Sequence, residues 1–597
     1  MAEYTAPLRD IRFVLEHLVD LGSVTDLPGF EHVDADGVYS VLEENARFME
    51  DLIAPLNRVG DEQGSVRNDD GSVTTPEGFS DAYRAYVDAG WNGVAFPPEY
   101  GGGGFPWLVG IAMQEMLTSA NMAFSMCPLL NQGAIDMLLH HASEEHKETY
   151  LPKMVTGEWT GTMNLTEPQA GSDVGALTTK AVPQADGTYR ITGTKIFISF
   201  GEHDMSQNIV HLVLARTPSA PPGTKGISCF IVPKLLLDDD GTPGARNDVS
   251  CVSIEHKMGI KASPTCVLAY GDNSDGAVGY LIGEENAGMR YMFTMMNNAR
   301  LSVGLEGLSL AERAFQMALA YAKERRQGRA PGSPAGEQSL IIEHPDVRRM
   351  LLTQKACIEA LRGIIYANAA AMDRAARHPD EAVRTGCDEL ADILTPVSKG
   401  WGTDLGVELT SLALQVFGGM GYIEETGIAQ HYRDARIAPI YEGTNGIQAM
   451  DLVGRKLPMR SGGAIGDYLG QIQATVDALA TAGDDLASIH AALADGLDAV
   501  RAATDWLLAN GLADPLDALA GATPYLRLFS LVTGGWVMAL QAQAAGRLLA
   551  DAAPADKDFY EGKVLTARFF CEQVLPQARG LLPAVTATNR DLAAAVF

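Results

Sequence analysis

The spacing of hydrophobic residues divides the chain into helical ends and a strand-rich middle. Between residues 38 and 56 apolar side chains recur every three or four positions, which predicts an amphipathic helix. The pattern stays helical from Pro76 to about Lys153. The clearest helix follows Pro345, where apolar residues from Val347 to Ile365 return to one face and the proline suits a first helical turn. We therefore expect packed helices on both sides of the middle segment.

The middle segment, from about Gly161 to Gly283, has short apolar runs separated by turn residues. Helical periodicity links none of these runs, so they predict an antiparallel β unit rather than alternating strands and helices. A polar stretch at 238–248 is expected to be an exposed excursion. The predicted strands lie at 189–192, 209–214, 226–232 and 266–270.

The order of elements predicts an α+β fold that is mostly α: helices, then a β-barrel-like antiparallel domain, then a four-helix bundle with extra helices after it. A doubly wound nucleotide-binding fold is not supported, because no G-x-G-x-x-G leads from a strand into a helix. The run Gly101–Gly104 also lacks the Lys-Ser/Thr of a phosphate loop. The expected segments are an N-terminal extension at 1–75, a helical domain at 76–160, a β domain at 161–284, a helical bundle at 285–457 and an additional helical domain at 458–597.

Composition and charge exclude several classes of protein. The chain of 597 residues has 75 acidic and 45 basic side chains and a net charge of −30, which repels nucleic acid and anionic membrane surfaces. It contains no apolar run long enough for a membrane span, and its first residues resemble neither a secretory signal nor a transit peptide. Seven scattered cysteines without a CxxC pair predict reduced thiols and a cytoplasmic location. His140, His141 and His344 have no second ligand at metal-site spacing, so we expect no metal.

The segment that says most about chemistry is Tyr441-Glu442-Gly443-Thr444-Asn445. Hydrophobic residues precede Glu442 and a glycine-containing turn follows it, so we expect this carboxyl group at the mouth of a core. Restricted access to water raises the pKa of a carboxylate and makes it a stronger base. Taken alone, however, such a glutamate is more often a helix cap or a surface turn residue.

The sequence YEGTNGIQ resembles the catalytic segment of the acyl-CoA dehydrogenase family, in which a glutamate between Tyr and Gly removes the α-proton of the substrate. Three further segments resemble the family in the same order. They are a first flavin signature at 164–173, a second flavin strand at 193–201 and, at 415–422, a glycine turn that meets a flavin pyrophosphate across a subunit boundary. The resemblance covers about residues 75 to 457 and implies FAD as the cofactor, an acyl-CoA as the substrate and Glu442 as the catalytic base.

The resemblance also implies roles for individual residues. Phe197 stands where the family commonly has a Trp against the isoalloxazine, and Ser199 where a hydroxyl group bonds flavin N5. In isolation these would be ordinary strand residues, and Thr166 or Ser172 an ordinary helix cap. Arg325 matches an arginine that pairs with the flavin pyrophosphate of a neighbouring subunit, although Gln327 and Gly328 depart from the usual Thr-Phe. The cofactor-binding candidates are Thr166, Ser172, Phe197, Ser199, Arg325, Gln415, Gly418, Gly419 and Thr444, and the substrate-binding candidates are Ser172, Asn297, Arg300, Tyr441 and Gly443.

By the same resemblance, Glu442 takes the α-proton while the β-hydrogen leaves as hydride to flavin N5, which gives a 2-enoyl-CoA. The Glu442 backbone N–H and a ribityl hydroxyl would donate hydrogen bonds to the thioester oxygen, which stabilise the negative charge that develops there.

The opening residues 4–13, the run 293–300 and the long helical C-terminus resemble one bacterial branch of the family, which includes 3-methylmercaptopropionyl-CoA dehydrogenases. The substrate implied is this thioether acyl-CoA or a fatty acyl-CoA, the acceptor an electron-transfer flavoprotein, and the assembly a homodimer, with a homotetramer as the alternative. Two other hypotheses stay open. One is an acyl-CoA oxidase that uses oxygen, and the other is a non-catalytic scaffold or binding relative, which the intact Glu442 and flavin segments weaken.

Overall fold

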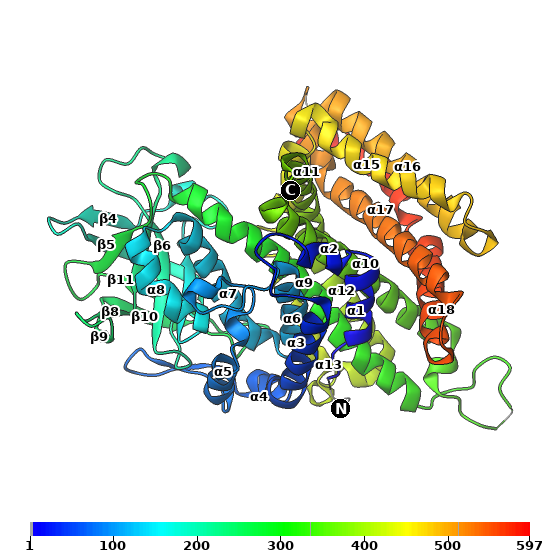
Figure 1. The fold of residues 1–597 in the computed structure, drawn as a ribbon, viewed down its shortest axis with the longest axis horizontal. Helices are drawn as coiled ribbons and strands as arrows, with labels where there is room; N and C mark the ends of the chain where they lie inside the picture. Colours follow the sequence, from blue (N-terminus) through cyan, green and yellow to red (C-terminus); the bar gives the residue numbers. More distant parts are fainter. Residues whose placement is uncertain (1–3, 335, 512) are drawn as a thin grey trace. The chain divides into compact units, whose positions relative to one another are not determined.

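The computed structural model describes residues 4–334, 336–511 and 513–597, and the side chains of Asn297 and Asp484 also lie outside this description. The chain forms two compact units (Figure 1). Residues 47–105 and 120–299 form the first, which we call the β unit. Residues 1–46, 106–119 and 300–597 form the second, which we call the helical unit.

The β unit combines short helices with one large sheet. Its helices are α4 (Leu56–Gln63), α5 (Phe79–Asp88), α7 (Met122–His141) and α8 (Glu144–Thr156). Its strands are β1 (Val66–Arg67), β2 (Val73–Thr74), β3 (Trp159–Asn164), β4 (Lys180–Pro183), β5 (Tyr189–Ser199), β6 (Asn208–Ala215), β7 (Ser228–Pro233), β8 (Leu235–Leu237), β9 (Pro243–Arg246), β10 (Val249–Ile254), β11 (Thr265–Tyr270) and β12 (Ala277–Leu281).

The sheet runs in the order β10-β11-β5-β12-β7-β6-β3, and β4 pairs with β5. All four predicted strands are present, as β5, β6, β7 and β11. The predicted antiparallel arrangement needs one correction, because β3 and β6 are parallel, with Trp159 opposite Asn208. The chain leaves β3, forms β4 and β5, and only then returns as β6, so these neighbours are joined by a long connection rather than a hairpin. The expected excursion at 238–248 contains the turn and second strand of the β8–β9 hairpin.

The core of the β unit lies between its helices and the sheet. Helices α7 and α8 pack on one face of β6 and β7, and side chains of β5, β10 and β11 pack against the other, so both faces of these central strands are covered. Every residue of β6 is buried, which explains why apolar residues fill Ile209–Leu214 except at His211.

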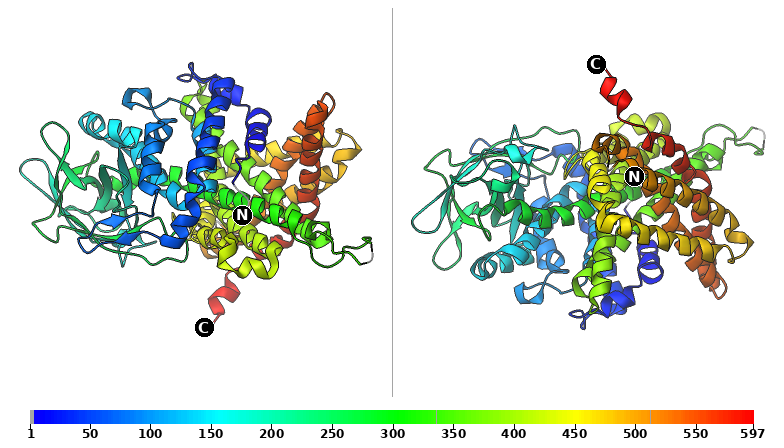
Figure 2. Two further views of the ribbon diagram at one scale, coloured as in Figure 1. Left: turned by 90° about the horizontal axis from the view of Figure 1, so that it is seen from below. Right: turned by 90° about the horizontal axis from the view of Figure 1, so that it is seen from above.

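The helical unit is built almost entirely of helices, many of them long (Figure 2). They are α1 (Leu8–His17), α2 (Leu21–Thr25), α3 (Ala35–Phe48), α6 (Trp107–Ala120), α9 (Gly288–Glu324), α10 (Pro345–Arg377), α11 (Glu381–Pro396), α12 (Gly402–Phe417), α13 (Ile428–Ala435), α14 (Asn445–Asp451), α15 (Gly463–Leu479), α16 (Ala487–Trp506), α17 (Pro515–Leu549), α18 (Pro554–Phe569), α19 (Gln577–Val585) and α20 (Arg590–Ala594). Helix α9 belongs to the β unit up to Ala299 and to the helical unit from Arg300, and α3 likewise passes from one unit to the other near its end. The predicted mostly helical α+β fold is confirmed.

Helix α17 forms the centre of the C-terminal helices. It packs against α16, α18 and α19, and also against α10 and α14. Its approach to α10 is close: a Cβ added to Gly363 of α10 would lie 2.3 Å from Val537 of α17. The helices after residue 458 therefore share one core with the segment that carries Glu442.

A buried cluster of charges connects three helices of the helical unit. Arg362 of α10 donates to Glu115 of α6 at 2.7 Å and to Glu312 of α9 at 2.9 Å. Tyr366 donates its hydroxyl hydrogen to the same Glu115 at 2.7 Å. These side chains are almost fully buried, so each charge is balanced by a partner rather than by water.

All seven cysteines belong to the described residues, and none of them forms a disulfide. Six are buried, and Cys387 of α11 is partly exposed. Throughout the described part, no helix has both the length and the apolar character needed to cross a membrane.

Candidate active site

The loop 441–445 connects the turns after α13 to the start of α14. The Asn445 backbone N–H donates to the Pro439 carbonyl at 3.1 Å, and the Thr444 hydroxyl caps α14 by accepting from the Ile447 N–H at 3.3 Å. Glu442 has a φ of 52° and Gly443 a φ of 82°, so two successive residues are left-handed. For a glutamate this conformation costs about 1–3 kcal/mol and persists only where the surroundings impose it.

Contacts on both sides hold this loop in place. The Tyr441 hydroxyl, just before Glu442, donates to the carboxyl group of Glu306 in α9. The Lys399 ammonium donates to the Asn445 side-chain oxygen at 2.9 Å. The Asn445 amide in turn donates to the Gly400 carbonyl at 2.9 Å.

Glu442 itself is half-buried and has unused hydrogen-bonding capacity. Within the described chain, neither its carboxyl group nor its backbone N–H has a hydrogen-bond partner. Burial raises the pKa of Glu442, and the nearby Arg300 and Lys399 cations oppose that shift. The carboxyl and the N–H are thus both free to engage a ligand, in a setting that increases the basicity of the carboxylate.

Two of the other predicted substrate residues, Arg300 and Gly443, lie at this loop. Arg300 is 4% exposed, and its guanidinium lies 3.9 Å from the carboxylate of Asp451. The position of Gly443 favours glycine because its φ is 82°, and an added Cβ would also lie 3.0 Å from the Gln448 amide nitrogen. The predicted contact of Asn297 falls on a side chain outside the described residues.

The predicted cofactor residues of the helical unit are exposed on two segments. Gln415, Gly418 and Gly419 lie at the end of α12, and Gly418 has a φ of 60° with no atom of the described chain within 4 Å of an added Cβ. Arg325 directly follows α9 and is exposed. Exposed backbone N–H groups of a glycine turn and a free guanidinium suit a phosphate group. Thr444 is also exposed, but its hydroxyl already caps α14.

In the β unit, the first and second flavin-like segments contact each other. The Ile196 N–H donates to the Thr166 carbonyl at 2.9 Å. Below them, the buried Lys195 ammonium donates to the Glu167 carboxylate and to the Leu165 carbonyl, both at 2.9 Å. Burial alone would raise the pKa of Glu167, but Lys195 and the hydroxyl and backbone donors of Thr178 and Thr179 lower it to about 2. This ion pair fastens the loop after β3 to strand β5.

Strand β5 turns Phe197 outward. Its pairing with β11 shifts register between Lys195 and Ile198, which is a β-bulge, and Phe197 has a φ of 59°. Such bulges re-aim a side chain, and the Phe197 ring is 59% exposed. Ser199 is half-buried two residues further on, and Ser172 is exposed in the loop after Thr166. An exposed aromatic face next to hydroxyl groups fits a planar ring system with polar edges, such as a flavin.

Four residues near these segments were not identified as functional from the sequence. They are the pairing partners Glu167, Lys195, Glu306 and Lys399. Charged side chains are rarely buried without a partner. The only local signals were therefore Lys195, which lies in a β strand, and Lys399 and Glu306, which lie in apolar helical runs. Which partner each one finds depends on the fold.

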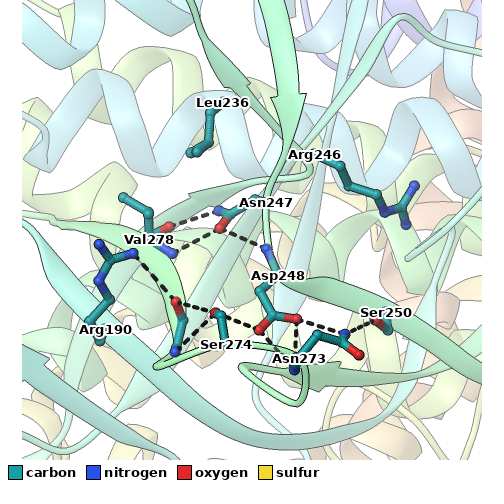
Figure 3. Close-up of a pocket in the computed structure, with 10 residues that line it drawn as sticks. Arg190, Leu236, Arg246, Asn247, Asp248, Ser250, Asn273, Ser274 and Val278 are labelled. Atoms are coloured by element: carbon teal, nitrogen blue, oxygen red, sulfur yellow. Dashed lines mark hydrogen bonds between the residues drawn. The ribbon is translucent and has the colours of Figure 1, made fainter.

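A separate polar pocket of about 370 Å³ lies in the β unit (Figure 3). Its polar atoms largely satisfy one another: Asp248 accepts from the Ser274 hydroxyl at 2.7 Å, and the Asn247 amide donates to the Val278 carbonyl at 2.9 Å. None of the predicted cofactor or substrate residues lines it. The described residues also contain no group of three or more His, Cys, Asp or Glu side chains able to hold a metal ion.

Four family models match successive parts of the chain. They are the acyl-CoA dehydrogenase N-terminal domain at 40–158, its middle domain at 162–272, its C-terminal domain at 286–457, and an acetyl-CoA dehydrogenase C-terminal-like model at 468–595.

Similar proteins cover the whole length. The 3-methylmercaptopropionyl-CoA dehydrogenase of Ruegeria pomeroyi is 48% identical over 99% of both chains. A butyryl-CoA dehydrogenase of Syntrophomonas wolfei is 38% identical over 98% of this chain and 97% of its own. The solved acyl-CoA dehydrogenase of Bacillus anthracis complexed with FAD has a TM-score of 0.73 and 20% identity, and the match covers 96% of this chain and 91% of that one. At this identity the last likeness shows the fold alone.

Proposed function

Because the chain belongs to the acyl-CoA dehydrogenase family, we propose that it oxidises an acyl-CoA thioester to the 2-enoyl-CoA, with Glu442 as the base. One observation carries this proposal. A half-buried carboxylate with a raised pKa stands on an imposed left-handed turn, and both its carboxyl oxygens and its backbone N–H lack partners in the described chain.

These two groups suit the two demands of the reaction. The carboxylate takes the α-proton of the thioester, and burial makes it a stronger base than a surface glutamate. The Glu442 N–H donates to the thioester oxygen, where negative charge develops as the proton leaves. Arg300 and Lys399 add positive charge near that position.

FAD is the proposed cofactor, and when bound it would accept the hydride from the β-carbon. The residues that would hold it are Phe197 against the ring, the Thr166, Ser172 and Ser199 hydroxyls, and Thr444. The segments at Gln415, Gly418, Gly419 and Arg325 would bind the pyrophosphate of the FAD in a neighbouring subunit. The exposed Phe197 ring and the exposed glycine turn support this assignment. The proposed electron acceptor is an electron-transfer flavoprotein, and the proposed assembly is a homodimer.

We propose a short acyl chain for the substrate, either straight or with a thioether. The names of the two relatives support this choice, since butyryl and 3-methylmercaptopropionyl groups are both short and both carry hydrogens on Cα and Cβ. Flavin bleaching by butyryl-, 3-methylmercaptopropionyl- and octanoyl-CoA would rank the candidates.

The test of the base is Glu442→Gln, which keeps the size of the side chain and removes its basicity. The variant should retain FAD, while bleaching of the flavin by acyl-CoA in a stopped-flow experiment falls by about 10²- to 10⁴-fold. Glu337→Gln, at an exposed loop position of the helical unit, is the matched control and should behave as wild type.

A near-normal bleaching rate in Glu442→Gln would place the base elsewhere, and a protein that takes up no FAD would refute the flavoenzyme proposal altogether. Hydrogen peroxide formed in step with substrate oxidation, at a rate unaffected by an electron-transfer flavoprotein, would indicate an oxidase instead.

A further inference from the structure

Glu306 is a buried carboxyl group in the middle of α9 whose only described partner is the residue before Glu442. It is 0% exposed, and one of its oxygens accepts from the Tyr441 hydroxyl. The other oxygen is buried and has no hydrogen-bond partner among the described residues. A buried polar atom left in this state destabilises a fold, so its retention needs another explanation than stability.

Lys399 holds the part of the loop that follows Glu442, as Glu306 holds the residue that precedes it. It is 0% exposed and lies in the π-helical turn Val397–Trp401, a local geometry often found at functional sites. Its ammonium donates to Asn445, three residues after Glu442. The loop 441–445 is therefore fixed at its first residue by a carboxyl group and at its last by an ammonium group.

Of the two groups that hold the loop, only Lys399 is mainly ionised at pH 7, whereas Glu306 is mainly neutral. Burial and the nearby Glu442 raise the pKa of Glu306 to about 8, so this carboxyl is mainly neutral at pH 7. Burial lowers the pKa of Lys399 to about 8 against the pull of nearby carboxylates, so it remains mainly charged. The ionisable groups that face this cluster are Arg300 and Glu306 of α9, Lys399, Asp404 of α12, Tyr441, Glu442 and Asp451 of α14.

We propose that Glu306 and Lys399 are positioning residues that hold the loop 441–445 from both sides and so present the Glu442 carboxylate to the substrate. This inference rests on the proposed function of Glu442. A neutral Glu306 accepts from Tyr441 without repelling the Glu442 anion. When Glu442 becomes neutral by taking the α-proton, the Lys399 ammonium loses one of its nearby carboxylates, and its positive charge then favours the negative charge developing on the thioester.

The experiment compares two changes at Glu306 in the holoenzyme. Glu306→Gln keeps an oxygen that can accept from Tyr441, whereas Glu306→Leu removes it, and Tyr441→Phe removes the donor with the smallest change in volume. Hydrogen exchange of a peptide spanning 441–445, followed by mass spectrometry without substrate, measures how firmly the loop is held. Stopped-flow bleaching measures the chemical step and the substrate Kd separately.

Glu306→Leu and Tyr441→Phe should each speed exchange in this loop, and slow bleaching, by roughly tenfold, the effect of one lost hydrogen bond. The Kd of the substrate should change by less than about threefold, because substrate contacts remain. Glu306→Gln should restore both rates to near wild type. On the other side, Lys399→Met should slow bleaching by a similar factor, and Lys399→Arg should recover part of it.

Glu312→Gln is the matched control, since Glu312 is also a buried carboxyl of α9 but pairs with Arg362 instead of the loop. It should lower stability and leave exchange at 441–445 unchanged. Unchanged exchange and bleaching in both Glu306→Leu and Tyr441→Phe would overturn the proposal, as would an equal effect of Glu312→Gln. If exchange rises in these variants while Glu442→Gln bleaches normally, the positioning contacts stand and the assignment of the base falls.

Discussion

Two buried histidines of the β unit make the stability of the protein depend on pH. The His203 ring shares a hydrogen bond of 3.0 Å with the Thr160 hydroxyl, and the His211 ring one of 2.7 Å with Thr162, next but one along β3. Burial, with a smaller contribution from the nearby Lys234, lowers the pKa of each histidine to about 3. In the unfolded chain a histidine has a pKa near 6.5.

The expected consequence is a loss of stability in mild acid. A group with a lowered folded-state pKa contributes stability above its unfolded pKa and loses it as pH falls. Each histidine should therefore remove about 1.4 kcal/mol of unfolding free energy per pH unit between about pH 6.5 and 3. Denaturant unfolding at pH 7, 6 and 5 should show a shallower pH dependence in His211→Gln than in wild type. Equal slopes would mean that His211 titrates normally in the folded protein.

At the scale of elements, α6, α9 and α10 meet at the Glu115–Arg362–Glu312 cluster. Burial removes the water around the two carboxylates and the guanidinium, and hydrogen bonds between these side chains replace their hydrogen bonds to water. Removing the central cation leaves both carboxylates facing each other without compensation. The cluster thus fixes the positions of the three helices relative to one another and adds little net stability.

Arg362→Met should accordingly destabilise the protein by about 3–5 kcal/mol, because it leaves buried carboxylates unpaired. Replacing Glu115, Glu312 and Arg362 together by apolar residues of similar size should recover most of that loss. Thermal unfolding of the single and triple variants measures both. A single variant as stable as wild type would show that water reaches this cluster.

The elements predictable from the sequence are those whose pattern is local. Short apolar runs bounded by turn residues identified β5, β6, β7 and β11, and the 3.6-residue period identified α10. Strands β3, β4, β10 and β12 of the same sheet were not predicted. The parallel pairing of β3 with β6 depends on the fold and has no local sequence signal.

The same division applies to the site. Glu442 and the Phe197 strand were recognisable from contiguous motifs. Glu306 was not, because its only local signal is its place in an apolar helical run, and its partner Tyr441 lies 135 positions away along the chain. The same holds for Lys399, 46 residues from Asn445. Long-range partners are set by packing, which a single sequence does not reveal.

For the whole molecule, the predicted functional residues divide between the two units. Thr166, Phe197 and Ser199 belong to the β unit, and Glu442 and its supporting residues belong to the helical unit. The C-terminal helices share the core of the helical unit, because α17 packs against α14 as well as α10. A substitution on the side of α17 that faces α14 therefore changes the packing of the helix that begins at Asn445, the last residue of the loop 441–445.

The distribution of the thiols provides a way to time the opening of each unit. Cys127, Cys229, Cys251 and Cys266 belong to the β unit, and Cys357, Cys387 and Cys571 to the helical unit. In the native protein we expect one rapidly alkylated thiol, Cys387, with Cys387→Ser as the control that has none. The remaining six should react only as fast as the structure around them opens. Mass spectrometry of the alkylated peptides would therefore measure a separate opening rate for each unit.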